Sequence, residues 1–447
     1  MGQKTTSRTI WAAISIILLI IGLAGGYFIG ATTVPTTTTE AAKTVTLTAT
    51  VTTTSTITTT LTQKETVSIT SLPTPTRTEI VLGATLPLSG ALSAHGQEVA
   101  EALKMAAEDI NNAGGITVKE GANLKIRLVI LDDKSDPTTS VNNLERLINV
   151  EHIDALVGGV AAALSAPLAA VCDKYKVPYV TAGVTNVRYF ERYYKYMWIV
   201  FHRIDANVEL TMKAFQSVGI KTLAYWEEKS EVGEEVGMWV KTLAPKYGMD
   251  VVFYESYVAG SKDFTDLIIR TKAKNPDAVM AHPTTPDAVT MIRQSKENDF
   301  NPKLFWLIRG ASTPVFYDNL GKDAEYVTDS LVWNPTLNRP GNAQLVARYT
   351  ERTGRPAGAL LGPSYTVMQV IAEAFKIAGT LDKEKVNEAI MKVYLPNTVM
   401  GPVKFTEKGS PVLQHEMNQW QDGKYVCVYP PELAVSNIKL APPWSSR

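Results

Sequence analysis

Cysteine is scarce in this chain of 447 residues, which contains only Cys172 and Cys427. Two cysteines are too few for a fold that depends on a framework of disulfides, and this excludes the small disulfide-stapled classes. Cys172 lies within the stretch SAPLAAVCDKY, which predicts an apolar helix. The middle of such a helix is the usual place for an inert, buried thiol.

The chain also has no excess of charge of either sign. It contains 44 basic and 44 acidic residues, so the formal net charge is zero at neutral pH, and no basic stripe is visible. Proteins that bind nucleic acid present clustered positive charge to the phosphates. We therefore expect no nucleic-acid partner.

Motifs of catalysis and of metal binding are missing as well. There is no G-x-S-x-G turn, no H-E-x-x-H helix, no paired CxxC and no phosphate-binding Walker loop. Adjacent residues of a strand point to opposite faces, so Asp132 and Asp133 cannot converge on one substrate. Five histidines are scattered without the spacing of metal ligands: His95, His152, His202, His282 and His415. We predict that the protein is not an enzyme and uses neither a metal nor another cofactor.

One long apolar run is present near the start of the chain. Residues Ile10–Ile29 form 20 uncharged residues, which as a helix would span ~30 Å, the thickness of a bilayer core. Lys4 and Arg8 precede the run, which places the amino terminus in the cytoplasm. We predict an uncleaved membrane anchor in residues 1–30; a cleaved signal peptide remains the alternative, although its apolar region is usually shorter.

Threonine dominates the segment that follows. From Ala31 to Thr70, 20 of 40 residues are Thr, and such a tract has too little apolar side chain to offset the entropy of ordering it. Residues 31–77 are therefore predicted to be a disordered linker, and Thr-rich tracts of this kind resemble O-glycosylated stalks. The expected location is the cell membrane, with one membrane pass and the globular part outside.

The remaining residues alternate between strand and helix patterns. The strand VLGATL leads through a Pro-Ser-Gly turn into a helix that closes on Asn112-Ala113-Gly114-Gly115, and a second strand delivers Asp132. A repeated strand–helix–strand module requires a parallel sheet. Open parallel sheets bind small ligands beyond the carboxyl ends of their strands. The fold class is therefore α/β, and about ten predicted strands favour two lobes over one.

Four motifs in this order carry a resemblance: PLSG, IN-x-x-GGI, DD-x-x-DP and the strand end LVGG. Together they resemble the solute-binding proteins of branched-chain amino acid ABC transporters, the type I periplasmic-binding-protein family. The resemblance covers nearly all of Glu79–Tyr429. It implies two lobes, each a parallel sheet flanked by helices, joined by a hinge of three crossovers.

The resemblance also implies how the chain divides. Lobe one would comprise residues 78–203 and 333–417, and lobe two residues 204–332 and 418–447. Cys172 and Cys427 then fall in different lobes. A disulfide between them would lock a hinge that must move, so we predict two free thiols.

Lobe one is expected to contribute three loops to the ligand site. His95 stands where the family places an aromatic residue over the ligand, and an exposed loop histidine is the alternative. Ala162 and Ala163 open a helix whose N–H groups would attract a carboxylate. Ala162 replaces the serine that the family has at this position. The alternative is that these alanines only pack the helix start. In the third loop the resemblance assigns Thr185 as donor to the ligand carboxylate and the Gly183 carbonyl as acceptor for an ammonium. Val184 and Asp205 complete the candidates from this part of the chain.

From lobe two, the family's two aromatic positions match Val232 and Thr284, and its acidic position matches Arg309 if one residue is inserted near Asn301. His282 lies beside this group, and Trp333 either walls the cleft or packs the hinge. The family's acid pairs with the ligand's α-ammonium. Since unit charges ~4 Å apart interact by ~4 kcal/mol at an effective dielectric near 20, the reversal predicts a carboxylate ligand without an α-amine. The alternative is a surface arginine in a loop.

The sequence therefore predicts a monomeric, membrane-tethered solute receptor. It would close its cleft over an amino acid or related carboxylate and present the closed form to a membrane permease. A ligand-sensing ectodomain of the same fold, or a binder of an acyl or aromatic acid, an amide or urea, remains an alternative.

Overall fold

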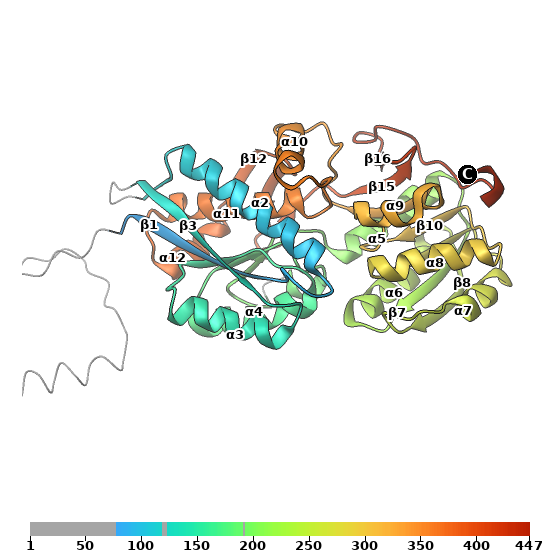
Figure 1. Cartoon of the computed structure of the whole chain (residues 1–447), viewed down its shortest axis with the longest axis horizontal. Coiled ribbons are helices and arrows are strands. Elements are labelled where there is room, and N and C mark those ends of the chain that lie inside the picture. Colours follow the sequence, from blue (N-terminus) through green and yellow to red (C-terminus); the bar gives the residue numbers. More distant parts are fainter. Residues whose placement is uncertain (1–76, 119–122, 191–192) are drawn as a thin grey trace, which may run out of the picture. The chain divides into compact units, whose positions relative to one another are not determined.

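The computed structural model describes residues 77–118, 123–190 and 193–447. The predicted anchor and the Thr-rich linker lie outside these residues, except for Arg77. Among the helices that are described, none is long and apolar enough to cross a membrane. Figure 1 shows how the described elements are arranged along residues 77–447.

Lobe one is built on a mixed sheet that is mostly parallel. In the described part of the chain this sheet has six strands in the order β2-β3-β1-β4-β5-β6. Five are parallel, and the short strand β2 pairs antiparallel with β3 at the edge. The strands are β1 (Glu79–Leu86), β2 (Ile116–Thr117), β3 (Asn123–Asp132), β4 (Ala155–Val157), β5 (Tyr179–Thr181) and β6 (Met197–Ile199).

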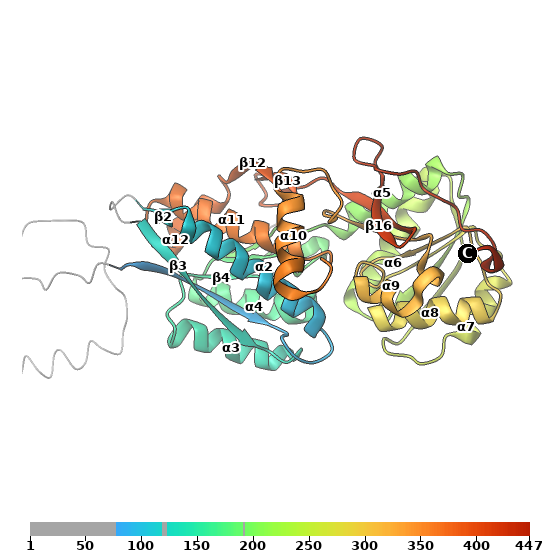
Figure 2. The same ribbon diagram turned by 45° about the horizontal axis from the view of Figure 1, so that its top comes forward.

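Helices from two distant parts of the chain cover this sheet. The first group is α2 (Ser93–Asn112), α3 (Pro137–Asn149) and α4 (Ala162–Tyr175); the second is α10 (Asn342–Thr353), α11 (Leu361–Ala378) and α12 (Lys383–Ile390). Helix α11 contacts α2 and α12 (Figures 1 and 2). A small antiparallel sheet follows, formed by β12 (Tyr394–Thr398), β13 (Gly401–Phe405) and β14 (Pro411–Val412).

Lobe two repeats the parallel pattern and adds a final hairpin. Its described sheet has seven strands in the order β16-β15-β11-β10-β9-β7-β8, in which β15 pairs antiparallel with both β11 and β16. The strands are β7 (Thr222–Glu228), β8 (Asp250–Tyr257), β9 (Ala278–Ala281), β10 (Leu304–Leu307), β11 (Val327–Leu331), β15 (Glu416–Gln421) and β16 (Lys424–Tyr429).

The helices of lobe two are α5 (Ile204–Ser217), α6 (Glu231–Leu243), α7 (Thr265–Lys272), α8 (Thr285–Glu297) and α9 (Pro314–Leu320). Short 3-10 turns occur at Val187–Tyr189, Ala244–Tyr247, Gly321–Ala324 and Trp444–Ser446. The two-lobed α/β architecture expected from the alternating pattern is therefore present, with antiparallel strands at the edges that the pattern did not predict.

The buried apolar residues fall into separate cores for the two lobes. One core is drawn from residues 80–201 and 332–405. Two further clusters are drawn from residues 204–331 and 417–428, with Ala359 joining them from the segment before α11. The chain therefore passes between the cores three times. Cys172 and Cys427 are both buried and free, as predicted.

Two carboxyl groups are buried where the last crossover enters lobe two. Glu416 of β15 is fully buried opposite Leu331 of β11, and neither of its oxygens has a hydrogen-bond partner among the described residues. Arg339 lies 3.8 Å away. Burial raises the pKa of Glu416 from its ordinary 4.5 to about 8, against the opposing effect of Arg339. Burial likewise raises the pKa of Asp329 to about 7.

This burial predicts a pH-dependent stability. The folded protein retains the Glu416 proton up to about pH 8, whereas the unfolded chain releases it near its ordinary pKa of 4.5. The stabilising contribution is thus complete below that lower value and is lost as the pH rises through the folded-state pKa. We expect the contribution of Glu416 to the free energy of unfolding to fall between pH 5 and pH 9, by about 1.4 kcal/mol for each unit of its pKa shift.

Denaturant unfolding of wild type, Glu416→Gln and Asp422→Asn at several pH values measures this loss. Glu416→Gln should flatten the profile, while Asp422→Asn, which changes an exposed carboxylate of the same hairpin, should follow wild type. Parallel profiles for wild type and Glu416→Gln would contradict the assignment.

Candidate functional site

A cavity of about 110 Å³ lies where the strand ends of the two lobes meet. Residues after β4, β5 and β6 of lobe one line it, as do residues after β9 and β10 of lobe two. This is the position that open parallel sheets offer to a ligand. The lining is Leu92, His95, Val160, Ala161, Ala162, Ala182, Gly183, Thr185, Phe201, His202, Val232, His282, Ile308, Arg309, Ser312, Leu331, Ala359 and Leu360.

Seven of the twelve residues that the sequence singled out are among this lining. They come from both lobes and from six different loops or helix starts, so the fold brings together positions up to 214 residues apart (95 to 309). These seven are His95, Ala162, Gly183, Thr185, Val232, His282 and Arg309.

The other five candidates lie outside the lining, and three of them are beside it in the chain. The Ala163 side chain is exposed on the first turn of α4, and that of Val184 is fully buried in the core of lobe one. Thr284 is the N-cap of α8, where its hydroxyl accepts a hydrogen bond from Asp287 N at 3.3 Å. In each case, the backbone turns the side chain away from the cavity.

Asp205 and Trp333 have structural contacts instead. Asp205, in the first turn of α5, forms an ion pair with Arg203 at 2.8 Å. Trp333 is fully buried, and its indole nitrogen donates to Asn342 Oδ1 at 2.8 Å. A methyl group at Gly362 would lie 2.3 Å from that nitrogen, so the ring packs directly on the start of α11. Trp333 therefore packs in the hinge and does not line the cavity.

The loops after β4 and β5 pack closely against each other. A methyl group at Gly183 would lie 2.6 Å from the backbone carbon of Gly159 and 2.5 Å from Ser165 Oγ. Gly159 itself has a φ of 141°, which favours glycine. Both positions therefore require glycine, and their contact places the half-buried Thr185 at the cavity near the start of α4.

The start of α4 has no side-chain cap. Its N-cap residue is Ala161, with a φ of 60°, and Ala162 follows at the cavity. The first N–H groups of a helix have no partner within the helix, and the dipole adds partial positive charge there. Together with Thr185, this end of the cavity offers hydrogen-bond donors suited to a carboxylate.

Arg309 lines the cavity from lobe two, but its charge is balanced. It forms an ion pair with the buried Glu228, and its guanidinium also donates to the carbonyl oxygens of Pro283 and His282, at 3.1 and 3.0 Å. The sequence argument treated Arg309 as an uncompensated positive charge. The structure corrects this, because Glu228 at the end of β7 neutralises it.

Three histidines line the cavity, and all are held neutral. Burial lowers the pKa of His95 to about 4, assisted by the positive charge of Arg309. Burial also lowers the pKa of His202 and of His282 well below the ordinary value, with further contributions from His415 and Arg309 respectively. The Nδ1 atoms of His202 and His282 are buried without a partner among the described residues.

Sequence reasoning missed His202 and most of the apolar lining. His202 follows β6 directly, so the rule that ligands meet strand ends could have identified it. Ala359 and Leu360, which precede α11, carried no comparable signal. The lining residues that were not singled out are Leu92, Val160, Ala161, Ala182, Phe201, His202, Ile308, Ser312, Leu331, Ala359 and Leu360; four of them, Leu92, Val160, Ala161 and Ala182, lie in the three loops expected from lobe one. No Asp or Glu is among the lining residues.

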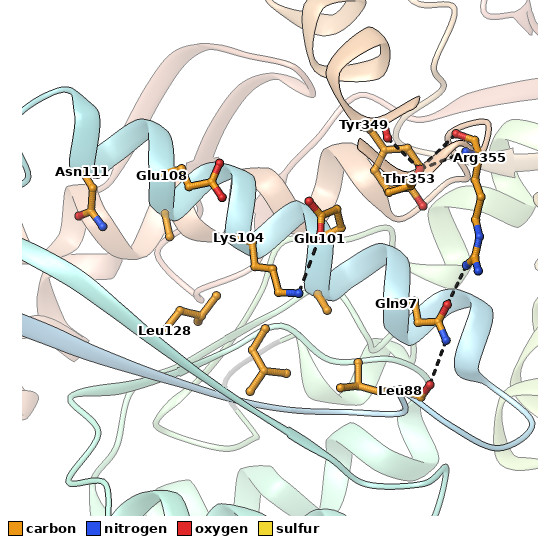
Figure 3. A pocket seen from close by; sticks show the side chains of 13 residues that line it. Leu88, Gln97, Glu101, Lys104, Glu108, Asn111, Leu128, Tyr349, Thr353 and Arg355 are labelled. Carbon is orange, nitrogen blue, oxygen red and sulfur yellow. Dashed lines mark hydrogen bonds and ion pairs between the residues drawn. The ribbon is translucent and has the colours of Figure 1, made fainter. Parts of the chain in front are cut away.

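A larger cavity, about 770 Å³, lies within lobe one (Figure 3). It runs between α2 and β3, and α10 contributes Tyr349 and Thr353. Gln97 links its two sides by bonds to Arg355 and to the Leu88 carbonyl, at 2.7 and 3.1 Å. No described residue of lobe two reaches it, so movement of the lobes would not enclose a ligand there. The cavity between the lobes is therefore the better candidate.

No group of three or more His, Cys, Asp or Glu among the described residues is arranged to hold a metal ion. The cavity combines hydrogen-bond donors at one end, apolar walls and neutral imidazoles.

Comparison with known proteins identifies the family. The family model for periplasmic binding protein matches residues 79–424. An amino acid binding protein of Pseudomonas aeruginosa is 29% identical over 367 residues, covering 80% of this chain and 95% of that protein.

Two solved structures share the fold at lower identity. The branched-chain amino acid transporter substrate binding protein LivJ of Streptococcus pneumoniae, in complex with isoleucine, has a TM-score of 0.71 at 19% identity and covers 79% of this chain and 100% of its own. An ABC transporter solute binding protein of R. palustris, in complex with benzoate, has a TM-score of 0.69 at 18% identity and covers 80% of this chain and 98% of its own. Because the family model spans most of the chain, the protein belongs to the periplasmic binding protein family.

Proposed function

We propose that this protein is the extracytoplasmic solute-binding component of an ABC importer, and that it captures a small carboxylic acid lacking an α-ammonium group. Family membership identifies the chain as a solute binder and not an enzyme. Solved structures of the same fold include substrate-binding proteins of ABC transporters. The expected partner in the membrane is therefore a permease that accepts the closed, loaded form.

The charge distribution of the cavity carries the ligand assignment. The start of α4 and Thr185 offer donors to a carboxylate, whereas no acidic side chain lines the cavity to receive an ammonium. Arg309 is already paired with Glu228, so the site as a whole is neutral toward the ligand. A free α-amino acid would bury its ammonium against the Gly183 carbonyl alone, and a buried charge without an ionic partner is costly.

Related proteins bind both classes of solute, isoleucine in one case and benzoate in another. A branched-chain amino acid is therefore the second candidate for this cavity. It is favoured only by the carbonyl of Gly183, which the resemblance assigns as the ammonium acceptor.

Closure is proposed to occur about the three crossovers, near residues 203–204, 332–333 and 413–415, the last of which lies between β14 and β15. The ligand would enter between the lobes and be enclosed when the hinge bends. A ligand-sensing ectodomain of the same fold remains an alternative, and reconstitution with a permease would separate the two functions.

The first prediction for this site concerns Thr185. Thr185→Val should remove one hydrogen bond to a charged group, worth ~1.5–3 kcal/mol, and so weaken binding of the carboxylate by about tenfold or more. Isothermal titration calorimetry against a panel of carboxylic and amino acids measures the change. Thr185→Ser keeps the hydroxyl and should bind as wild type does. Unchanged affinity in Thr185→Val would show that Thr185 does not contact the ligand.

The second concerns the Arg309–Glu228 pair. Glu228→Gln keeps the shape of the side chain but leaves the positive charge of Arg309 unbalanced, so carboxylates should bind severalfold more tightly and with a stronger dependence on salt. Titrations at low and high ionic strength measure both effects. Weaker binding of carboxylates by Glu228→Gln, at equal thermal stability, would contradict the assignment.

The third concerns the tether, which we infer from the apolar run Ile10–Ile29 behind Lys4 and Arg8. The mature protein should keep its amino terminus and sediment with membranes. Intact-mass spectrometry of protein from both the membrane fraction and the medium tests this. A mature chain that begins just after the apolar run and is released into the medium would exclude the anchor.

A further inference from the structure

Two buried histidines meet at the cavity, one from each lobe. His202 follows β6 of lobe one, and His282 follows β9 of lobe two; both line the cavity. Only 4% of His202 and 5% of His282 is exposed. The Nδ1 atom of each lacks a hydrogen-bond partner among the described residues. Both imidazoles line the cavity, and neither forms a hydrogen bond with another described residue, so the rings have hydrogen-bonding capacity left for a ligand.

A neutral imidazole has one nitrogen that donates and one that accepts. Burial keeps the pKa of both rings well below the ordinary value, so this neutral form applies at physiological pH. Buried polar atoms are nearly always hydrogen-bonded in folded proteins, and an unpaired one calls for a partner. The nearby walls are partly apolar, because Phe201 lies beside His202 with ring centroids 4.1 Å apart and Ile308 and Leu331 also line the cavity.

We propose that His202 and His282 form a polar subsite for a hydroxyl or carbonyl oxygen of the ligand, which makes the ligand a hydroxy- or oxo-substituted carboxylic acid. This inference rests on the proposed function, since it takes the carboxylate to be bound at the start of α4 and Thr185. It adds the residues that recognise the end of the ligand opposite the carboxylate.

The strand order sets the scale of the distance between the carboxylate donors and His202. Strands β4, β5 and β6 are neighbours in that order, and they lead to Ala162, Thr185 and His202 respectively. Neighbouring strands are about 4.8 Å apart. The histidine subsite is therefore roughly 5–10 Å from the carboxylate donors, which places the second oxygen several bonds from the carboxylate.

The volume limits the size of the ligand. The cavity measures about 110 Å³, whereas an engineered cavity of about 150 Å³ in another protein accommodates benzene. The cavity is therefore smaller than one that holds benzene, so the ligand should be a short-chain acid. 4-Hydroxybutanoate and 5-hydroxypentanoate have this form, and butanoate and pentanoate are the matched acids without the distal oxygen.

Calorimetric titration of the full-length chain with these two pairs of acids tests the subsite. In each pair, the hydroxylated acid should bind about tenfold more tightly or better, because a site built to bond a hydroxyl rejects the analogue that lacks it. His202→Phe and His282→Phe should each reduce that ratio to about one. His282→Gln retains a hydrogen-bonding group and should keep part of the preference, and thermal unfolding verifies that each variant folds.

The outcomes separate this inference from the proposed function. Equal or tighter binding of the unsubstituted acids by wild type would overturn the subsite alone, as would a preference that survives both phenylalanine variants. Tighter binding of leucine, isoleucine or valine than of every acid, or no binding of any acid, would overturn the proposed ligand class and the subsite together.

Discussion

The site depends on the contact between the loops that follow β4 and β5. Gly159 and Gly183 approach so closely that a methyl group on either would overlap backbone or buried side-chain atoms. This contact holds the start of α4 beside Thr185, and neither element could supply a carboxylate subsite alone. Asp132 plays a similar part for the preceding loop, because it accepts hydrogen bonds from Leu88 N and Ser89 N, at 3.0 and 3.2 Å. The ligand end of lobe one is therefore determined mainly by backbone packing, with few side chains that mark it as functional.

This explains which parts of the architecture could be predicted from sequence. Strand and helix periodicity predicted the parallel sheets, since each buried strand is a short apolar run. The loop Gly183–Thr185 could be identified because close packing requires a glycine at position 183. The antiparallel strand β15 could not be placed in lobe two by pattern, because its buried residues include Glu416, Asn418 and Gln419. A strand with these polar residues would be predicted to be exposed, unless the residues that bind them in the folded protein were known.

The charge of the cavity was harder to predict from the sequence than the fold. The sequence shows that position 309 is an arginine, but it does not show that Arg309 is paired with Glu228, which is 81 residues away in the chain and lies on another strand. A sequence shows charged residues one at a time, whereas the field at a ligand depends on which of them are paired. His202 and His282 pose the same difficulty, since the neutrality of both follows from burial that only the folded lobes produce.

The return crossover after β11 shows how the two lobes can be joined without a continuous sheet. Asn334 donates to Asn418 Oδ1 at 2.9 Å and to the Tyr425 carbonyl at 3.2 Å, so it ties the crossover to the final hairpin. Asn342 donates to the carbonyl of Leu337 at 2.9 Å and accepts from Trp333. Amide side chains replace the ladder bonds that the backbone loses where regular structure stops. Such bonds hold a crossover in place while leaving its backbone torsions free to change, which suits a segment about which two lobes must rotate.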